Sequence, residues 1–264
     1  MSLHATQLSD SPAMGGMARR LRLYAPDAPP PPQGWPLLTL LDGDWVWPLA
    51  NQALQHCAVL IPSHGPLGSA GPEALARRAL DYTPPAPDGG HWPDPRTPQW
   101  QGGGAPAFLD ALLGPMLAWA SIQTRLDPAR HALYGHSYGG LCALFALSHR
   151  ADDFAHILCA SPSLWWHDQA ILKVLDRLGD HPPVRPIRLT LMAGTDERWY
   201  PQPVNPHAPR TRQNGIPTLP AMQVLMRKLA CIPRLDCRLE LLDQMGHGQV
   251  LPASAQRAIA LAAT

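Results

Sequence analysis

Hydrophobic positions along the chain fall into two patterns, which predict two kinds of element. Short continuous apolar runs closed by glycine or proline, such as PLLTLL and AVLI, have the length of strands buried on both faces. Longer runs between them repeat their apolar residues at helical spacing. Strands are expected at 21–24, 36–41, 58–61, 132–134, 156–160, 187–193 and 237–242, and helices at 72–80, 108–120, 139–147, 169–178, 219–229 and 252–263.

This alternation of strands and helices predicts an α/β protein with a mostly parallel central sheet and helices on both faces. The polar residues 1–15 are expected to form a flexible tail, and residues 16–264 a single domain. Many of the 32 prolines cluster near 82–105 and 199–217. Because helix interiors and central strands tolerate proline poorly, both segments are expected to be loop insertions that border the functional site.

Composition narrows the possible partners. A formal net charge of +1 provides no field that would attract nucleic acid or an anionic membrane. No apolar run approaches the ~20 residues that span a bilayer, and the first residues lack the basic and apolar pattern of a signal peptide. A cytoplasmic protein is therefore expected. The five cysteines show no metal-ligand spacing and are expected to be mostly small buried hydrophobes. The oligomeric state is not indicated.

One motif carries nucleophile chemistry. Residues 135–139, GHSYG, match G-x-S-x-G, with a short apolar strand before them and the apolar helix LCALFAL after them. This context predicts a sharp strand-to-helix turn that presents Ser137. The beginning of the helix would favour negative charge developing at this position. Ser137 is therefore the candidate nucleophile.

A hydroxyl is a weak nucleophile and needs a base within hydrogen-bond reach. His247 lies in the glycine-flanked loop MGHG, after the last strand and before the closing helix, and is the candidate base. The acid of such a site lies between the serine and the histidine in the chain, after the penultimate strand. The turn GTDER at 194–198 offers Asp196 and Glu197. Asp196 is favoured because G-x-D is the common arrangement, and a serine–histidine dyad without an acid stays open.

Stabilising a tetrahedral oxyanion takes two backbone donors. The N–H of Tyr138, directly after the nucleophile, is one candidate. The other is expected in the LDGD segment at 41–44, with the Asp44 N–H preferred and Gly43 second, although this segment could also be an ordinary turn.

Aromatic and cationic residues near these motifs are candidate substrate contacts. Tryptophan can stack on an aromatic group or fill the core, and arginine can hold an anion or lie solvated in a loop. The candidates are Trp45, Trp165, Trp166, Arg198, Arg210 and Arg212.

Several short motifs occur in a familiar order: LLDG at 40–43, DYTP at 81–84, GGGA at 102–105, YGHSYGGL at 134–141, SPSLWW at 161–166 and GHG at 246–248. Together they resemble an esterase family of the α/β-hydrolase superfamily, and within it the branch that opens catechol siderophores such as enterobactin and salmochelin. The resemblance implies an α/β-hydrolase fold and hydrolysis of a small-molecule carboxylic ester through a Ser137 acyl-enzyme, with His247 as base and with no metal or other cofactor. The alternative is a general carboxylesterase or thioesterase of the S-formylglutathione hydrolase type.

Overall fold

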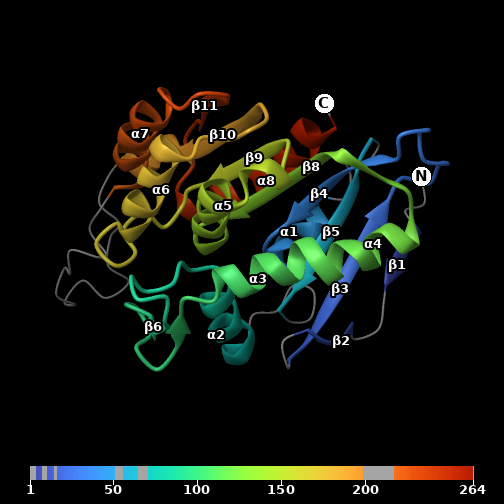
Figure 1. Cartoon of the computed structure of the whole chain (residues 1–264), viewed down its shortest axis with the longest axis horizontal. Coiled ribbons are helices and arrows are strands. Elements are labelled where there is room, and N and C mark those ends of the chain that lie inside the picture. Colours follow the sequence, from blue (N-terminus) through green and yellow to red (C-terminus); the bar gives the residue numbers. More distant parts are fainter. Residues whose placement is uncertain are drawn as a thin grey trace.

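The computed structural model describes residues 4–7, 11–14, 17–50, 56–64, 71–198 and 217–263. Within these ranges the central sheet has nine strands in the order β1-β3-β5-β4-β8-β9-β10-β11, with β2 paired to β3 (Figure 1). The strands are β1 His4–Gln7, β2 Ser11–Met14, β3 Met17–Ala25, β4 Trp35–Leu40, β5 Ala58–Ser63, β8 Leu126–His136, β9 His156–Ala160, β10 Ile187–Gly194 and β11 Leu235–Leu242.

The six strands from β5 to β11 along this order pair in parallel, as the sequence predicts, while β3 pairs antiparallel with β5. The segment expected to be a flexible tail contains β1 and β2, which both pair antiparallel with β3. Pairing with an edge strand uses backbone hydrogen bonds and needs no apolar side chains. The polar composition of this segment therefore did not reveal these strands.

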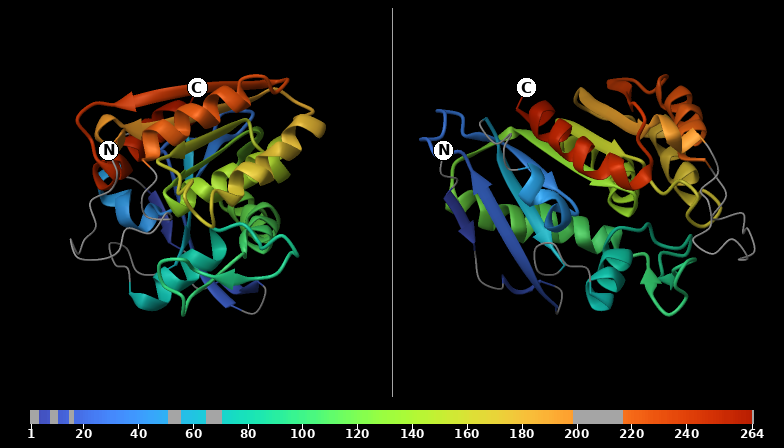
Figure 2. Two further views of the ribbon diagram at one scale, coloured as in Figure 1. Left: turned by 90° about the vertical axis from the view of Figure 1, so that its left-hand side faces the viewer. Right: turned by 180° about the vertical axis from the view of Figure 1, so that it is seen from behind.

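Helices cover both faces of the sheet (Figure 2). Helices α1 and α8 pack on each other on one face, and α5 packs against β8 and β9 on the opposite face. On that second face α5 is accompanied by α2, α3, α4, α6 and α7, whose buried side chains belong to the same core cluster. The bounds are α1 Gly43–Ala50, α2 Pro72–Asp81, α3 Ala105–Ala111, α4 Leu117–Gln123, α5 Tyr138–His149, α6 Ala170–Asp180, α7 Thr218–Leu229 and α8 His247–Ala262.

Side chains of the central strands alternate between the two cores. In β8, Leu133 packs under α5, whereas Tyr134 points to the core under α8; in β9, Ile157 and Leu158 divide in the same way. Strands buried on both faces need apolar residues at every position, which explains their continuous apolar runs. Each fully buried leucine or isoleucine contributes about 1.5–3 kcal/mol. Three of the five cysteines, Cys57, Cys142 and Cys159, are buried, and all five are free thiols.

Helices α3 and α4 are joined through a π-helical turn, Leu112–Met116, into one helix from Ala105 to Gln123. Among the described residues it is the one helix long and apolar enough to cross a membrane by length and composition. Six of its side chains instead lie in the core beside the sheet, namely Ala105, Phe108, Leu109, Leu112, Met116 and Ala120. In this fold the apolar stripe of the helix is thus used for packing.

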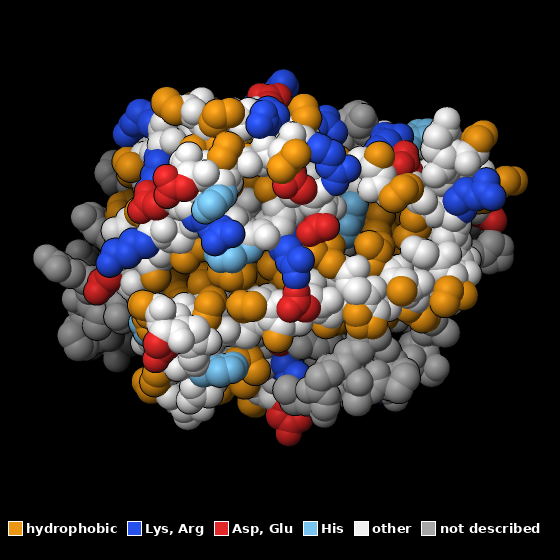
Figure 3. All heavy atoms as spheres, viewed as in Figure 1, with side chains coloured by type: hydrophobic (Ala, Val, Ile, Leu, Met, Phe, Trp, Pro, Cys, Tyr) orange, Lys and Arg blue, Asp and Glu red, His pale blue; other side chains and the backbone are white. Residues whose placement is uncertain are grey.

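The first proline-rich insertion, 82–105, is ordered around a small antiparallel ribbon of β6 (Trp92–Pro93) and β7 (Gln101–Gly102). The second insertion lies outside the described residues except for Pro217, and so do Arg210 and Arg212. On the face drawn in Figure 3, charged side chains of both signs are scattered without a large patch of one sign.

Candidate active site

The turn between β8 and α5 places Ser137 in a strained conformation, with φ 57° and ψ −112°. A Cβ on Gly135 would lie 2.1 Å from the carbonyl oxygen of Gly139, so that only glycine allows the strand and helix to approach so closely. Ser137 thus lies at the carboxyl end of a central strand and at the beginning of a buried helix. The predicted strand–turn–helix context of the GHSYG motif is confirmed.

His247 lies beside this serine. Its Nε2 is 3.2 Å from the Ser137 Oγ, and its Nδ1 is 2.9 Å from Oε2 of Glu197. The imidazole is the first side chain of α8, which begins five residues earlier than the apolar pattern predicted. About half of the imidazole is exposed, with a relative accessibility of 47%, whereas the Glu197 carboxylate is buried at 4%. A substrate can therefore reach the histidine, but solvent does not reach the carboxylate.

The structure corrects the preference for Asp196. After β10 the chain forms a 3-10 helix, Thr195–Arg198, which turns Glu197 inward and leaves Asp196 exposed. The Asp196 backbone N–H donates to the carbonyl oxygen of Met245 at 3.2 Å and so ties this turn to the loop that carries His247. Glu197, which the sequence left as the alternative, is the carboxylate that contacts the imidazole.

The Glu197 carboxylate is held by three donors. Besides His247, the Ser161 hydroxyl and the Gly194 backbone N–H, at 3.1 Å, both donate to its Oε1. Burial opposes ionisation, but the hydrogen bonds from His247 and Ser161 outweigh it and hold the pKa of Glu197 below its ordinary value. Glu197 is thus a buried carboxylate that keeps its charge against the imidazole.

The SPS tripeptide at 161–163, directly after β9, contacts both Glu197 and Ser137, the two residues that flank His247. Ser161 bonds Glu197, while the Ser163 Oγ lies 3.1 Å from the Ser137 Oγ. The Ser163 backbone N–H also donates to the Ser137 carbonyl at 3.1 Å. Both serines are buried. These roles were missed, although their place directly after the strand that neighbours the nucleophile strand is a usable signal.

His136, the residue before the candidate nucleophile, contacts the backbone of the candidate base. Its Nε2–H donates to the His247 carbonyl at 3.0 Å, and the two rings lie 4.6 Å apart. Burial, and then the nearby His247, lower the pKa of His136 well below its ordinary value. A neutral His136 thus fixes the backbone of His247 without adding a second charge to the site.

The candidate oxyanion loop after β4 lies against the beginning of α5. A Cβ on Gly139 would lie 3.0 Å from Oδ2 of Asp42. Arg78 donates to both Asp42 carboxylate oxygens at 2.6 Å and to the His136 carbonyl at 3.1 Å, so that one buried guanidinium joins the loop to the nucleophile turn. Because α1 begins at Gly43 and α5 at Tyr138, the first N–H groups of both helices lack an intrahelical acceptor.

The side chain of Asp44 contacts the carboxyl end of β5, which is parallel to β4. Its carboxylate accepts from Arg22, from Ser63 and, at 3.1 Å, from the His64 backbone N–H. The predicted role of Asp44 concerned its backbone N–H alone, and its buried carboxylate anchors the loop in the fold.

The predicted substrate contacts differ in their surroundings. Trp166 is fully buried, with its ring 4.9 Å from that of Trp92, which corrects its assignment as a substrate contact: this tryptophan fills the core. Trp165 and Trp45 are half-buried, and Trp45 lies 4.9 Å from the Arg78 guanidinium. Arg198 is exposed and donates to the Thr195 carbonyl at 2.7 Å.

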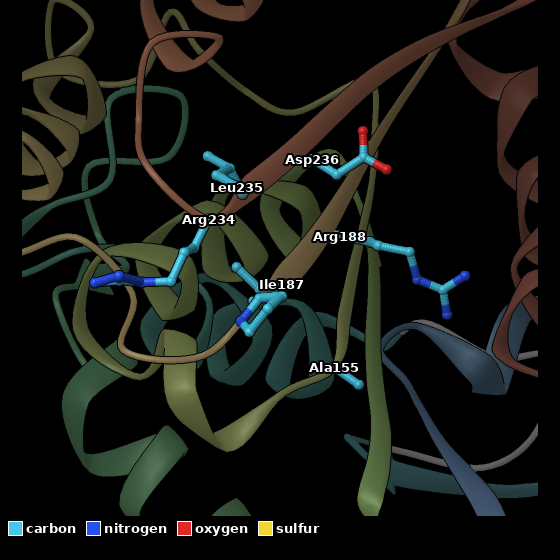
Figure 4. A pocket seen from close by; sticks show the side chains of 7 residues that line it. Ala155, Ile187, Arg188, Arg234, Leu235 and Asp236 are labelled. Atoms are coloured by element: carbon cyan, nitrogen blue, oxygen red, sulfur yellow. The ribbon is translucent and has the colours of Figure 1, made fainter.

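A pocket of about 600 Å³ lies elsewhere, at the amino ends of β10 and β11 (Figure 4). Ser137 follows the carboxyl end of β8, so this pocket is at the opposite edge of the parallel sheet. Its lining includes Arg188, Arg234 and Asp236 but no serine, cysteine or histidine. Within the described part of the chain, no three His, Cys, Asp or Glu side chains are grouped so that they could hold a metal ion.

Comparisons with known proteins agree with this geometry. The family model described as "Putative esterase" matches residues 11–214. Ferri-bacillibactin esterase BesA from Bacillus subtilis (strain 168) is 28% identical over 258 residues, which cover 90% of this chain and 82% of BesA. Siderophore hydrolase EstA from Aspergillus nidulans has a similar structure, with a TM-score of 0.77, 22% identity and coverage of 99% of this chain and 94% of EstA. S-formylglutathione hydrolase FrmB from Staphylococcus aureus has a TM-score of 0.62, 16% identity and coverage of 100% and 97%.

The parallel sheet, the strained serine turn and the neighbouring histidine define an α/β-hydrolase. The chain belongs to the esterase family whose model matches most of its length, and it is a carboxylic ester hydrolase.

Proposed function

We propose that this protein is a serine esterase that opens the lactone esters of catechol siderophores through an acyl-enzyme on Ser137. The observation that carries the mechanism is the continuous chain of hydrogen bonds from the Ser137 Oγ through His247 to the buried Glu197. The substrate class is supported by the motifs of the chain and by its similarity to ferri-bacillibactin esterase BesA. We further propose that the protein acts in the cytoplasm on this small molecule, without nucleic acid, membrane, metal or other cofactor.

In the first step, Glu197 accepts the Nδ1–H of neutral His247, which leaves Nε2 free to take the Ser137 proton as the oxygen attacks the ester carbonyl. The carboxylate then stabilises the imidazolium that forms, and its burial keeps this interaction strong. His247 returns the proton to the leaving alkoxide. Water repeats the sequence on the acyl-enzyme and regenerates the serine.

The tetrahedral oxyanion is proposed to rest on two backbone donors, the N–H of Tyr138 and the N–H of Asp44, with Gly43 as the alternative to Asp44. Two observations support this arrangement. Helices α1 and α5 both begin at the carboxyl ends of the strands that precede them, and the Arg78 guanidinium fixes the loop after β4 against the turn after β8. Loss of one such donor typically lowers the rate by about 100-fold or more.

Steady-state kinetics on two substrates test the proposal: a small aryl acetate and a triscatechol trilactone. Wild type is compared with Ser137→Ala and with Ser121→Ala, a control at an exposed serine on α4. We expect wild type and Ser121→Ala to prefer the trilactone and Ser137→Ala to cleave neither ester.

Preference for the small ester, or for short acyl thioesters, would make the protein a general carboxylesterase or thioesterase of the S-formylglutathione hydrolase type. Full activity of Ser137→Ala would overturn the mechanism itself.

A further inference from the structure

A second functional feature lies in the 82–105 insertion, where one buried carboxylate fixes the turn of the β6–β7 ribbon. Asp94 is 1% exposed. Its Oδ1 accepts the backbone N–H of Arg96 at 2.9 Å and that of Thr97 at 3.0 Å, and its Oδ2 accepts the Tyr138 hydroxyl at 2.7 Å. The insertion is thereby anchored to the residue that directly follows the candidate nucleophile.

The same turn brings a cation onto two aromatic rings. The Arg96 guanidinium lies 4.8 Å from the Tyr138 ring centroid and 4.5 Å from that of Trp165, and these two rings lie 6.1 Å apart. Arg96 is exposed, and within the described ranges no carboxylate lies at ion-pair distance from its guanidinium. Stacking on two rings limits the motion of the guanidinium while leaving its charge available.

Tyr138 and Trp165, the two residues whose rings contact Arg96, both lie close to Ser137. Tyr138 is the neighbour of Ser137 in the chain. Trp165 is two residues beyond Ser163, whose Oγ is 3.1 Å from the Ser137 Oγ. A substrate group that extends from the ester carbonyl toward the 82–105 insertion would therefore meet a half-buried indole face and a guanidinium.

We propose that Arg96, Tyr138 and Trp165 form a subsite for an anionic aromatic group of the ester substrate. The proposal rests on the ester hydrolysis proposed above and narrows its substrate class. The guanidinium supplies charge and paired donors to phenolate or carboxylate oxygens, while Trp165 offers a surface for the ring. Two sources share this chemistry: an iron-bound catecholate, whose phenolic protons are released to water when the oxygens bind the metal, and an aryl ester that carries a free carboxylate.

Two matched substrate pairs test the subsite. One pair is the ferric and the iron-free form of a triscatechol trilactone, and the other is 3-carboxyphenyl acetate and phenyl acetate. Within each pair the ester is the same type and the charge of the aromatic part differs. The readout is the ratio of kcat/KM for the anionic over the neutral member, measured with KM and kcat resolved, for wild type, Arg96→Met, Arg96→Lys and the control Arg125→Met. Arg125 is an exposed arginine that donates to the Pro32 carbonyl just before the amino end of β8.

We expect Arg96→Met to lower the ratio about three- to tenfold, mainly through KM, in the pair that carries the relevant anion. Arg96→Lys, which keeps the charge without the planar fork, should lie between Met and wild type, and Arg125→Met should match wild type. A response in the trilactone pair alone identifies the catecholate as the ligand, and a response in the aryl acetate pair alone identifies the carboxylate.

Equal ratios in all four proteins, or equal losses on neutral and anionic esters together with a lower Tm, would overturn the subsite. In either case ester hydrolysis itself would stand. If wild type cleaves none of the four esters, the proposed function fails and the subsite with it.

Discussion

Glu197→Gln is expected to lower kcat/KM by about a thousand- to ten-thousandfold, whereas Asp196→Asn should change it less than about twofold. Glutamine has nearly the same shape, and its amide oxygen can still accept the hydrogen bonds from Ser161 and the Gly194 N–H. Its NH₂ group then faces Nδ1 of His247, which must become the acceptor. The imidazole proton moves to Nε2, where it points at Ser137, and the base is lost.

The magnitude follows from the burial of this contact. The Glu197 side chain is 4% exposed, so that water cannot replace the missing charge opposite the imidazolium. A loss of this size corresponds to about 4–5.5 kcal/mol of transition-state stabilisation. Asp196 is exposed and contributes through its backbone N–H, which asparagine retains.

The assay is hydrolysis of an aryl acetate under steady-state conditions, with thermal unfolding as the control for folding. Glu197→Asp is a further control, because it keeps the charge but shortens the side chain. A larger loss in Asp196→Asn than in Glu197→Gln would refute the assignment of the acid. A loss below about tenfold in both variants would show that Ser137 and His247 act as a dyad.

Three further predictions concern the supporting residues. Ser161→Ala removes a charge-assisted hydrogen bond to Glu197 and should lower kcat/KM about tenfold or more. Ser163→Ala removes a neutral hydrogen bond to Ser137 and should lower kcat/KM about fivefold or less. Steady-state kinetics of the two variants compare these losses directly. A Cβ on Gly194 would lie 1.9 Å from the Met245 carbonyl oxygen, so Gly194→Ala should destabilise the protein by at least about 1–3 kcal/mol in urea unfolding and displace the loop that carries His247. Burial lowers the pKa of His131 from 6.5 to about 4, so between these values the unfolded chain binds a proton that the folded protein does not. His131 alone should therefore lower the free energy of unfolding by up to about 3 kcal/mol as the pH drops from 6.5 to 4, and His136 and His156, whose pKa values are also lowered by burial, should add to this slope. The pair His131→Leu with Thr39→Val, which removes both hydrogen-bond partners, should make this slope smaller. An unchanged slope in urea titrations would contradict the assignment.

Strands buried on both faces and a helix with one clearly apolar face were predictable from the sequence. Strand β9 has the predicted bounds, and β10 and α7 differ from them by one residue at one end. Helix α1 was missed because GDWVWPLA contains a proline and two tryptophans and begins directly after a turn, so that its composition does not indicate a helix. Tertiary packing against α8 and β5 compensates for the weak propensity.

At the site, sequence order and motif context were sufficient for the position of Ser137 and of His247, because a strand–turn–helix and a glycine-flanked histidine are local features. The choice between Asp196 and Glu197 depends on how the chain turns after β10. In the 3-10 helix adjacent side chains point in different directions, so a shift of one residue decides which carboxylate lies inside. Neither residue type nor spacing carries that information.

The arrangement of the site follows from strand order more than from any single motif. Strands β8, β9 and β10 are neighbours in the sheet, and their carboxyl ends present Ser137, the SPS tripeptide and Glu197 side by side. Because β9 lies between β8 and β10, the loop that follows it reaches both Ser137 and Glu197. A tripeptide with two buried serines at this position can fix both groups at once. Polar residues in the loop after a strand that pairs with the nucleophile strand should therefore be interpreted as part of the site, even where they are not nucleophiles themselves.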